Sequence, residues 1–512
     1  MTEAADLILT NAEVHTLARP DETHEAVAVR RGRIARVGDA YDLDFLSGVD
    51  TRVVDCDGRV VLPGFIDAHT HLDILGRRLV HADLSGAESR ADALARLRDR
   101  AAAVGAGDPV VGFGYDESAW AESDYLTRTD LDAVDAVGPV VAVREDLHVV
   151  SLDSTAIERL GDGLPAAGVR REGGEPTGVV VEAAAEAVLD ALGPDAEGMV
   201  DLLRAAQEYA NARGVTGVHD MIRGGHMARA YRDLARDDAL TLRVRLNYWG
   251  DHLDALVETG LRTNHGEGLV RVGAIKTLTD GSLGGRTARL STPYSDAPDE
   301  RGEWVVTPAE FRDLLDSADA GGFQIAAHAI GDEAVAEVAD AFAGKSSTPR
   351  ENRHRIEHAE LASDGAIDHL AEAGVVASVQ PNFHRWAGAD GLYADRLGDR
   401  RTETNRLGRL AEADVHLAFG SDGMPLDPLF GVHHAVNAPT AAQRLGVTEA
   451  LRAYTLGSAY AGFDEDRLGT VEPGKCADLV VLDGSPWDRP GGIDDIDVSL
   501  TVVDGAVVHD GR

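Results

Sequence analysis

The chain has 512 residues, of which 44% are hydrophobic and 27% charged, a balance that fits a folded globular protein and excludes a mostly disordered one. Its 88 acidic and 49 basic residues give a formal net charge of −39, which would repel nucleic acids and anionic lipid surfaces. The only cysteines, Cys56 and Cys476, exclude a disulfide scaffold or a zinc finger, and we expect both to be small buried hydrophobic residues.

The acidic residues are spread along the whole chain, and the only lysines are Lys276, Lys345 and Lys475. Such a composition is typical of a high-salt cytoplasm, where salt screens the self-repulsion of the protein. No run of about 18 apolar residues is present, and the acidic start lacks the basic segment of a secretory signal. We therefore expect a cytoplasmic protein with no membrane partner and no nucleic-acid partner.

Short β-prone runs separated by tight turns fill residues 1–62, and the same pattern returns in residues 463–512. Each of these pieces is too small to bury a core alone. We therefore predict that 1–62 and 463–512 pair in one composite β-sandwich, with the rest of the chain inserted between them.

Strands alternate with helices between these ends, which predicts a parallel sheet and an α/β fold. The eight predicted strands are 60–66, 215–219, 242–248, 270–278, 324–327, 353–357, 375–379 and 415–419. Helices are predicted from a capping box at Thr307-Pro308-Ala309-Glu310 and over 332–342, 363–373 and 448–461. This pattern predicts a (β/α)₈ TIM-like barrel over 63–462, whose chemistry lies at the C-terminal ends of the strands.

The stretch between the first and fourth strands is much longer than three βα units of roughly 30 residues each require. We expect an inserted α/β segment over about 80–195 that covers the mouth of the active site.

Histidines, one lysine and one aspartate stand at the predicted strand ends. His69 and His71 are two residues apart on a strand, so both side chains point to one face and could bind one metal ion. The later strands end near Lys276, His328, His358 and Asp422. Each histidine taken singly could be structural, but their joint position at strand ends favours a metal site.

Lys276 lies in an apolar strand of a chain that otherwise uses arginine. It could pair with a buried acid or bind phosphate, but arginine would serve either role. A buried lysine can become a neutral amine and react with CO₂, and the resulting carbamate could bridge two cations.

These residues lie within motifs that resemble the amidohydrolase superfamily, and its amidohydrolase-3 branch of N-substituted formamide deformylase-like (YtcJ-like) proteins in particular. The matching segments are LPGFIDAHTH (62–71), PTGV (176–179), KTLTDGSLG (276–284), TA (287–288), HAIGD (328–332), IEH (356–358), GSD (420–422) and PGKCADL (473–479). Two segments depart from the family pattern, Gly423-Met424-Pro425 and Asp146-Leu147-His148, and both concern substrate contacts more than metal binding.

The resemblance implies a complete ligand set. His69, His71 and Asp422 would hold one divalent cation, His328 and His358 a second, and carboxylated Lys276 would bridge them. These ligands suit Zn²⁺, and also Fe, Mn or Ni, with one or two ions bound. The family often forms dimers, so a homodimer is compatible with the resemblance.

The expected activity is hydrolysis of a non-peptide C–N bond in a small-molecule amide, such as an N-substituted formamide, by metal-activated water. Asp422 would act as the general base. Deaminase or cyclic amidase activity, or a non-catalytic regulatory role, are the alternatives. Candidate substrate contacts are Tyr115, Trp120, Asp146, His148, His219, Asp280 and Arg286.

Overall fold

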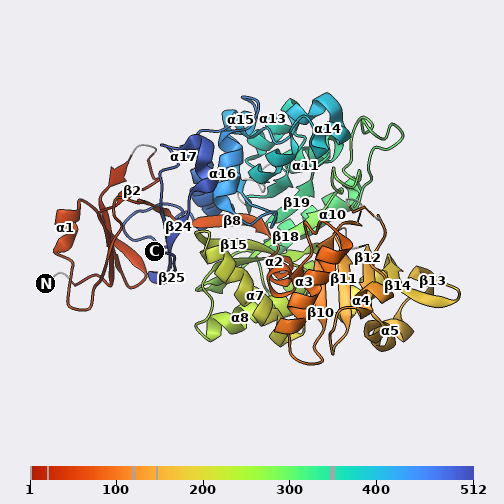
Figure 1. Ribbon diagram of the computed structural model, residues 1–512. Coiled ribbons are helices and arrows are strands. Elements are labelled where there is room, and N and C mark those ends of the chain that lie inside the picture. The colour runs from red at the N-terminus through yellow and green to blue at the C-terminus, as the bar shows by residue number, and fades with distance from the viewer. Residues whose placement is uncertain (1–2, 20–21, 118–119, 122, 146–147, 346–351) are drawn as a thin grey trace. The chain divides into compact units, whose positions relative to one another are not determined.

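A barrel of eight parallel strands forms the centre of the computed structural model, which describes residues 3–19, 22–117, 120–121, 123–145, 148–345 and 352–512 (Figure 1). Neighbouring strands follow chain order: β8 (Phe65–Thr70), β15 (Val215–Ile222), β16 (Arg243–Trp249), β18 (Val270–Leu278), β19 (Ile325–Ala329), β20 (Arg355–His358), β21 (Val376–Val379) and β22 (His416–Phe419). The short strand β17 (Gly266–Glu267) pairs with the start of β18. The predicted TIM-like barrel is therefore confirmed.

The last and first strands of the barrel are joined just beyond β22. The backbone N–H of Asp422 donates to the carbonyl oxygen of His69 at 2.8 Å. The buried carboxylate of Asp67 accepts hydrogen bonds from the backbone N–H of Ser421 (3.0 Å) and from its hydroxyl (2.5 Å). These bonds bring the ends of β8 and β22 together, which places the first and last predicted ligand groups side by side.

The first predicted strand, 60–66, is wrong as a single element. It consists of two strands, β7 (Val60–Pro63) and β8, with Gly64 between them. β7 pairs with strands of the sandwich, whereas β8 pairs with β15 of the barrel. A Cβ atom on Gly64 would lie 2.2 Å from the side chain of Thr216, so only glycine fits at this crossing. The apolar run continues across the junction because both strands are buried, which hides the change of sheet.

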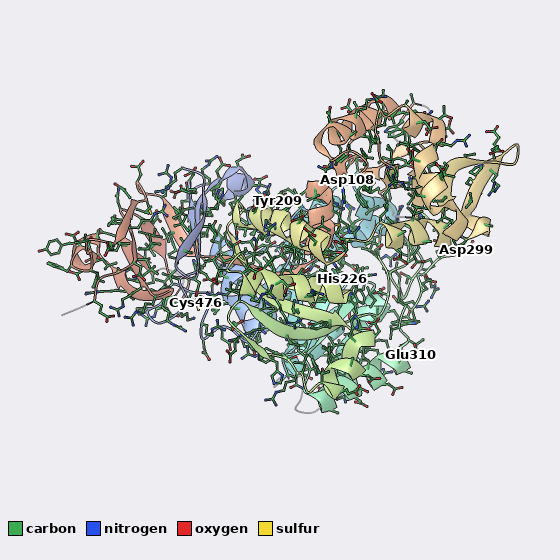
Figure 2. All side chains as sticks on the ribbon, turned by 90° about the horizontal axis from the view of Figure 1, so that it is seen from below. Asp108, Tyr209, His226, Asp299, Glu310 and Cys476 are labelled. Atoms are coloured by element: carbon green, nitrogen blue, oxygen red, sulfur yellow. The ribbon has the colours of Figure 1, made fainter. Side chains whose placement is uncertain are left out.

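Segments from both ends of the chain build the predicted composite sandwich (Figure 1). One sheet has β5 (Arg33–Gly38), β4 (Ala26–Arg30), β1 (Leu7–Thr10) and β6 (Arg52–Asp55), with α1 (Ala40–Asp44) beside it. The other has β25 (Ala506–Asp510), β24 (Val498–Val503), β23 (Leu479–Leu482), β7, β2 (Glu13–His15) and β3 (Thr23–His24). Leu9, Val27, Leu479 and Leu500 share one core. Cys56 and Cys476 (Figure 2) are both buried and free, as predicted.

Three predicted helices are confirmed close to their predicted positions: α10 (Pro308–Gly321), α11 (Asp332–Ala343) and α13 (Asp364–Ala373). The other helices of this unit are α8 (Gly225–Arg236), α9 (Leu253–Glu258), α14 (Leu392–Leu397), α15 (Leu407–Glu412), α16 (Pro428–Val436), α17 (Val447–Arg452) and α18 (Ser458–Ala461). Helix α7 (Ala196–Asn211) leads into β15. The capping box at the start of α10 is confirmed: Thr307 and Glu310 (Figure 2) exchange hydrogen bonds. The predicted helix 448–461 is divided by a π-helical turn at Ala453–Gly457.

Residues 72–206 form a separate compact unit. Its sheet contains β13 (Val169–Glu172), β14 (Glu175–Val181), β12 (Val149–Leu152), β11 (Val140–Arg144), β10 (Val110–Tyr115) and β9 (Ala82–Asp83). Its helices are α2 (Leu72–Val80), α3 (Arg90–Ala103), α4 (Arg128–Asp132), α5 (Ser154–Leu160) and α6 (Ala183–Ala191). Among the described residues of the whole chain, no helix is long and apolar enough to cross a lipid bilayer.

Candidate metal centre

The C-terminal ends of the barrel strands surround a cavity of about 420 Å³. Six predicted side chains from β8, β18, β19 and β20 and from the segment after β22 line it, namely His69, His71, Lys276, His328, His358 and Asp422. In a barrel of this kind the strand ends are the positions from which side chains converge. Residues more than 350 positions apart in the sequence, such as His69 and Asp422, therefore meet at one site.

His69, His71 and Asp422 form the tightest group. One donor atom from each lies within 4.8 Å of the others, close enough to bind one metal ion. Asp422 Oδ1 is 3.3 Å from His71 Nε2 and 3.7 Å from His69 Nε2. Asp422 has a positive φ of 55°, a conformation that non-glycine residues rarely adopt and that is concentrated at functional sites.

His328 and His358 lie against this group. The ring centroids of His328 and His358 are 4.5 Å apart, and those of His358 and His69 are 4.8 Å apart. The three rings therefore follow one another around the cavity wall. His358, like Asp422, has a positive φ, of 70°.

Each of these three imidazoles has a hydrogen-bond acceptor at one ring nitrogen, which orients the ring. His69 Nδ1 lies 2.5 Å from Glu357 Oε2, His358 Nδ1 lies 2.7 Å from Gln380 Oε1, and His328 Nε2 lies 3.1 Å from the Gly281 carbonyl oxygen. Since these oxygens accept, the named nitrogens carry the protons and the other ring nitrogen keeps its lone pair.

Burial lowers the pKa of His69, His328 and His358 well below the ordinary value, so these rings are neutral and can act as ligands. Burial opposes ionisation of Asp422, but the hydrogen bond from His71 and the nearby Lys276 lower the pKa of its carboxyl below the usual range. The site thus presents neutral imidazoles and an ionised carboxylate, the donor set of a divalent cation.

Lys276 is 2% exposed, and its Nζ has no hydrogen-bond partner among the described residues. Burial is the main cause that lowers the pKa of its amine to about 8. An amine without a partner is costly to bury, so the lone buried Nζ indicates that a further group belongs beside it. A carbamate formed on this amine would supply anionic oxygen ligands at this position.

Glu357 and Arg355 hold the ring of His69 through hydrogen bonds. Arg355 donates to both oxygens of Glu357, at 2.5 and 3.0 Å, and also to the carbonyl oxygen of Ala68 and the hydroxyl of Ser378. Burial alone would raise the pKa of Glu357, but Arg355 lowers it below the usual value. An ionised Glu357 can therefore hold the ring of His69.

Most of the remaining cavity wall is apolar or aromatic and was not foreseen from the sequence. Its larger apolar and aromatic side chains are Trp249, Leu278, Leu283, Ile330, Phe383, Trp386, Leu392, Tyr393 and Met424, and the charged Arg223 also lines it. Glu360 also lines it, hydrogen-bonded to the hydroxyl of Tyr393. Burial raises the pKa of the Glu360 carboxyl to about 8. Trp249 is the last residue of β16, so it also lies at a C-terminal strand end, where the ligands were predicted. It was not predicted because tryptophan is not a metal ligand.

Four of the predicted substrate contacts belong to the separate unit 72–206. Tyr115 is buried there, and its hydroxyl lies 3.1 Å from Ser151 Oγ. Trp120 is buried and donates to the carbonyl oxygen of Ala87 at 2.8 Å, and exposed His148 lies 3.1 Å from Glu182. Asp146 lies outside the described residues.

The other three have partners of their own in the barrel unit. Asp280 accepts hydrogen bonds from the backbone N–H groups of Arg289, Ile330 and Gly331, so its carboxylate fixes the loop after β19. Arg286 forms a two-point ion pair with Asp296. His219 accepts a hydrogen bond from Arg355 and lines a different cavity, described below.

A sequence model described as the amidohydrolase family matches residues 52–509. The chain belongs to the amidohydrolase family. It is 31% identical to putative amidohydrolase YtcJ of Bacillus subtilis over 97% of this chain and 98% of that one. It is 27% identical to N-substituted formamide deformylase of Arthrobacter pascens, covering 100% of this chain and 99% of that one.

A solved structure of a metal-dependent hydrolase has a similar fold. The chain resembles an uncharacterized metal-dependent hydrolase from Pyrococcus furiosus with a TM-score of 0.81 and 31% identity, covering 94% of this chain and 99% of that one. The family resemblance drawn from the sequence motifs is thus confirmed, and this amidohydrolase is a relative of metal-dependent hydrolases.

Proposed function

We propose that this amidohydrolase cleaves a non-peptide C–N bond in an N-substituted formamide that carries an apolar or aromatic substituent. The observation that carries the proposal is that one cavity is lined both by six metal-type side chains and by mostly apolar and aromatic side chains. Membership of the family supports hydrolysis of a C–N bond. Similarity to N-substituted formamide deformylase supports a formamide as the substrate.

One or two divalent cations fit the donor set. His69, His71 and Asp422 would hold one, and His328 and His358 the other. Neutral imidazoles and a carboxylate suit Zn²⁺, with Fe, Mn or Ni as further options. Lys276 would bridge them after its neutral amine adds to CO₂, which forms an N–C bond and releases one proton. The unpartnered, buried Nζ supports this modification.

A bound divalent cation would lower the pKa of water from 15.7 to about 7 and polarise the substrate carbonyl. The carboxylate of Asp422 accepts a proton from the attacking water as the new C–O bond forms. The same carboxyl group then returns the proton to the departing nitrogen as the C–N bond breaks, leaving an amine and formate. Asp422 can serve in this way because the hydrogen bond from His71 and the nearby positive charge keep the pKa of its half-buried carboxyl below the usual range.

The aromatic wall accounts for the proposed substituent. Trp249, Phe383 and Trp386 line the same cavity as the ligand set, and the ring centroids of Phe383 and Trp386 are 4.7 Å apart. Burying an apolar group against such side chains contributes roughly 25 cal/mol per Å². An aromatic substituent on the amide nitrogen would therefore be bound more tightly than a methyl group.

The test is a substrate panel with the metal-loaded chain in potassium chloride at molar concentration, the setting we propose from the net charge of −39. The panel holds a formamide with an aromatic N-substituent, the matching acetamide, a cyclic amide and an amino-substituted heterocycle. We expect amine and formate in equal amounts from the formamide. Ammonia release from the heterocycle, or cleavage of the cyclic amide alone, would overturn the proposal in favour of a deaminase or a cyclic amidase. Absence of both bound metal and cleavage would overturn the proposal in favour of a non-catalytic regulatory protein.

A matched pair of variants tests the aromatic wall. Trp386→Ala should raise KM for the aromatic formamide by about 10-fold or more and change KM for N-methylformamide much less. Trp304→Ala removes a half-buried tryptophan that is not among the residues lining the cavity and should leave both KM values unchanged. Equal effects of the two substitutions would contradict the assigned substituent site.

A further inference from the structure

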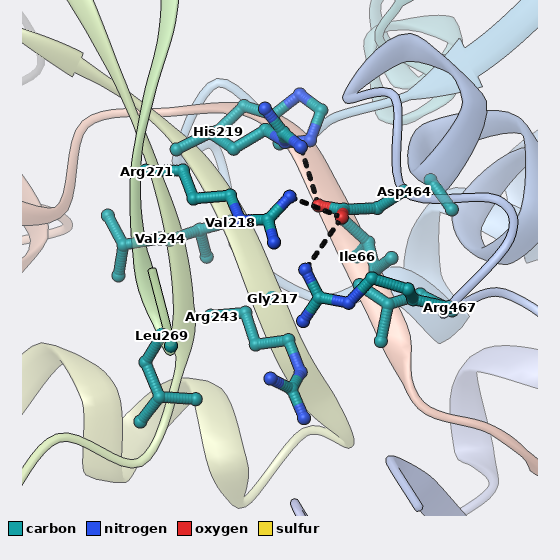
Figure 3. Close-up of a pocket in the computed structure, with 14 residues that line it drawn as sticks. Ile66, Gly217, Val218, His219, Arg243, Val244, Leu269, Arg271, Asp464 and Arg467 are labelled. Atoms are coloured by element: carbon teal, nitrogen blue, oxygen red, sulfur yellow. Dashed lines mark hydrogen bonds and ion pairs between the residues drawn. The ribbon is translucent and has the colours of Figure 1, made fainter. Parts of the chain in front are cut away.

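A second cavity, of about 20 Å³, is drawn in Figure 3; arginines at the starts of barrel strands line it, whereas the metal centre lies at the strand ends. Arg243 and Arg245 at the start of β16 and Arg271 at the start of β18 line it, together with Arg467 from the C-terminal segment. A cluster of arginines is unexpected in a chain with a net charge of −39. Arg243 is compensated, because it contacts both Asp478 and Asp504.

The other three arginines share one carboxylate, that of Asp464. Arg245 Nη2 lies 2.6 Å from Asp464 Oδ2, while Arg271 Nη1 and Arg467 Nη1 lie 3.3 and 3.1 Å from Oδ1 (Figure 3). Within the described part of the chain, no second carboxylate pairs with these three guanidinium groups. The cluster therefore holds two more positive than negative charges: Arg245 and Asp464 are 5% and 8% exposed, whereas the side chains of Arg271 and Arg467 are 24% and 27% exposed. Buried charge without a counter-charge is strongly unfavourable.

At least one hydrogen-bond donor at this cavity has no partner among the described residues, and a second belongs to a residue that lines it. Arg271 Nε is buried and has no hydrogen-bond partner among the described residues. His219 Nδ1 accepts from Arg355 at 2.8 Å, so the proton of the imidazole is on Nε2. A Cβ atom on Gly462 would lie 2.5 Å from Arg245 Nε and 2.8 Å from His219 Nε2, so glycine keeps this space open. Burial, together with Arg271 and Arg467, lowers the pKa of Arg245, which agrees with uncompensated positive charge.

We propose that this cavity binds a single halide ion, chloride in the cell, between Arg245, Arg271 and Arg467. The excess of two positive charges favours an anion, and the unpartnered Arg271 Nε and the Nε2–H of His219, which lines the cavity, would donate hydrogen bonds to it. The small cavity, of about 20 Å³, favours a monatomic anion over a larger one. The ion stabilises the fold by neutralising the cluster, and it lies at the end of the barrel away from the chemistry.

The first test is direct detection. Crystals of the full-length, metal-loaded chain grown in potassium bromide should give an anomalous bromide peak within about 3.5 Å of Arg271 Nε, since bromide replaces chloride without changing the contacts. Density with no anomalous signal, which would be water or an adventitious ion only, would overturn the proposal.

The second test compares two salts at equal potassium concentration, so that general screening of the −39 charge is constant. The Tm of the wild-type chain should rise by about 2–4 °C from potassium gluconate to potassium chloride and should saturate with chloride, as binding to one site requires. Equal Tm values in both salts would refute the site.

Three variants separate the site from general salt effects. Arg271→Met should abolish the difference between the salts, whereas Asp464→Asn removes the competing carboxylate and should let chloride saturate at a lower concentration. Arg312→Met, which removes an exposed arginine paired with Glu337, is the matched control and should keep the wild-type difference. If Arg271→Met does not fold, Asp464→Asn and the bromide peak still decide the question: a higher saturating concentration in Asp464→Asn would contradict the proposal.

Discussion

Lys276→Met is the substitution that separates the metal-free and metal-loaded states most sharply. Methionine has about the length of lysine and no charge, so it can fill the same buried space. In the metal-free chain, Lys276 is 2% exposed and its Nζ has no hydrogen-bond partner among the described residues. Without metal, the substitution therefore removes the free-energy cost of burying a charged amine. With metal bound, it removes a ligand.

The magnitude follows from the pKa of the buried amine. Burial lowers the pKa of Lys276 from 10.5 to about 8, and each pKa unit corresponds to about 1.4 kcal/mol. Near pH 7 the charged amine thus destabilises the metal-free folded state by about 3 kcal/mol. We expect metal-free Lys276→Met to be more stable than metal-free wild type by about 2–3 kcal/mol. With metal bound the order should reverse, because the variant cannot form the carbamate.

The assay combines unfolding in urea, with and without a chelator, with elemental analysis and amide hydrolysis. The variant should lose at least one cation per chain and at least roughly 10²-fold in turnover, as expected for a lost ligand. Lys345→Met is the control: this lysine pairs with Asp316 at the surface, so its loss should cost at most about 1 kcal/mol and leave metal content unchanged. Retained metal and turnover in Lys276→Met, or a metal-free variant less stable than wild type, would refute the reasoning.

Three further predictions concern Asp422, Arg355 and His384. Asp422→Asn should lower turnover by roughly 10²–10⁴, the usual share of a general acid–base group, and unchanged turnover would remove that role from Asp422. Arg355→Lys should weaken metal binding by roughly 10–100-fold in a chelator titration, because an ammonium group cannot match the paired contacts to Glu357; unaltered affinity would contradict this. Burial lowers the pKa of His384 to about 3, below its ordinary 6.5, so the unfolded chain binds this proton more readily and stability falls as the pH drops below 6.5. His384→Phe should remove roughly 2–3 kcal/mol of the loss of unfolding free energy between about pH 6.5 and about pH 4.5, measured in urea with chelator present, and an unchanged pH slope would show that His384 is not the group.

The sequence was enough for the barrel and for the placement of the six ligand-type residues, because both depend on local patterns. Alternation of strands and helices predicts parallel order, and parallel order brings all C-terminal strand ends to one rim. His69, Lys276 and His328 could therefore be assigned to one site without any knowledge of contacts. The structure then adds the distances and the partners that orient each ring.

The cavity wall could not be predicted in the same way. Phe383 and Trp386 follow β21 in a short 3₁₀ segment, and nothing in their spacing distinguishes a substrate wall from a packed core. The junction at Gly64 was missed for a similar reason, since buried strands of two different sheets have the same apolar composition. Asp280 was assigned to substrate on its position, whereas the structure shows it holding three backbone N–H groups.

Side chains on one face of β16 line both the arginine cavity and the metal cavity. Residues two apart on β16 point to the same face. Arg243 and Arg245 line the arginine cavity, Asn247 accepts from the backbone N–H of Ala274 at 2.7 Å, and Trp249 lines the metal cavity. The inward face of this strand thus changes from charged to amide to aromatic within 7 residues.

A polar chain runs between the two cavities beside that strand. His219 of the arginine cavity accepts from Arg355, Arg355 donates to Glu357, and Glu357 accepts from His69 of the metal centre. The charges of Arg355 and Glu357 neutralise each other, so this row of hydrogen-bonded side chains has no net charge. The metal centre therefore does not neutralise the excess positive charge near Asp464. An anion bound beside the three arginines would neutralise it.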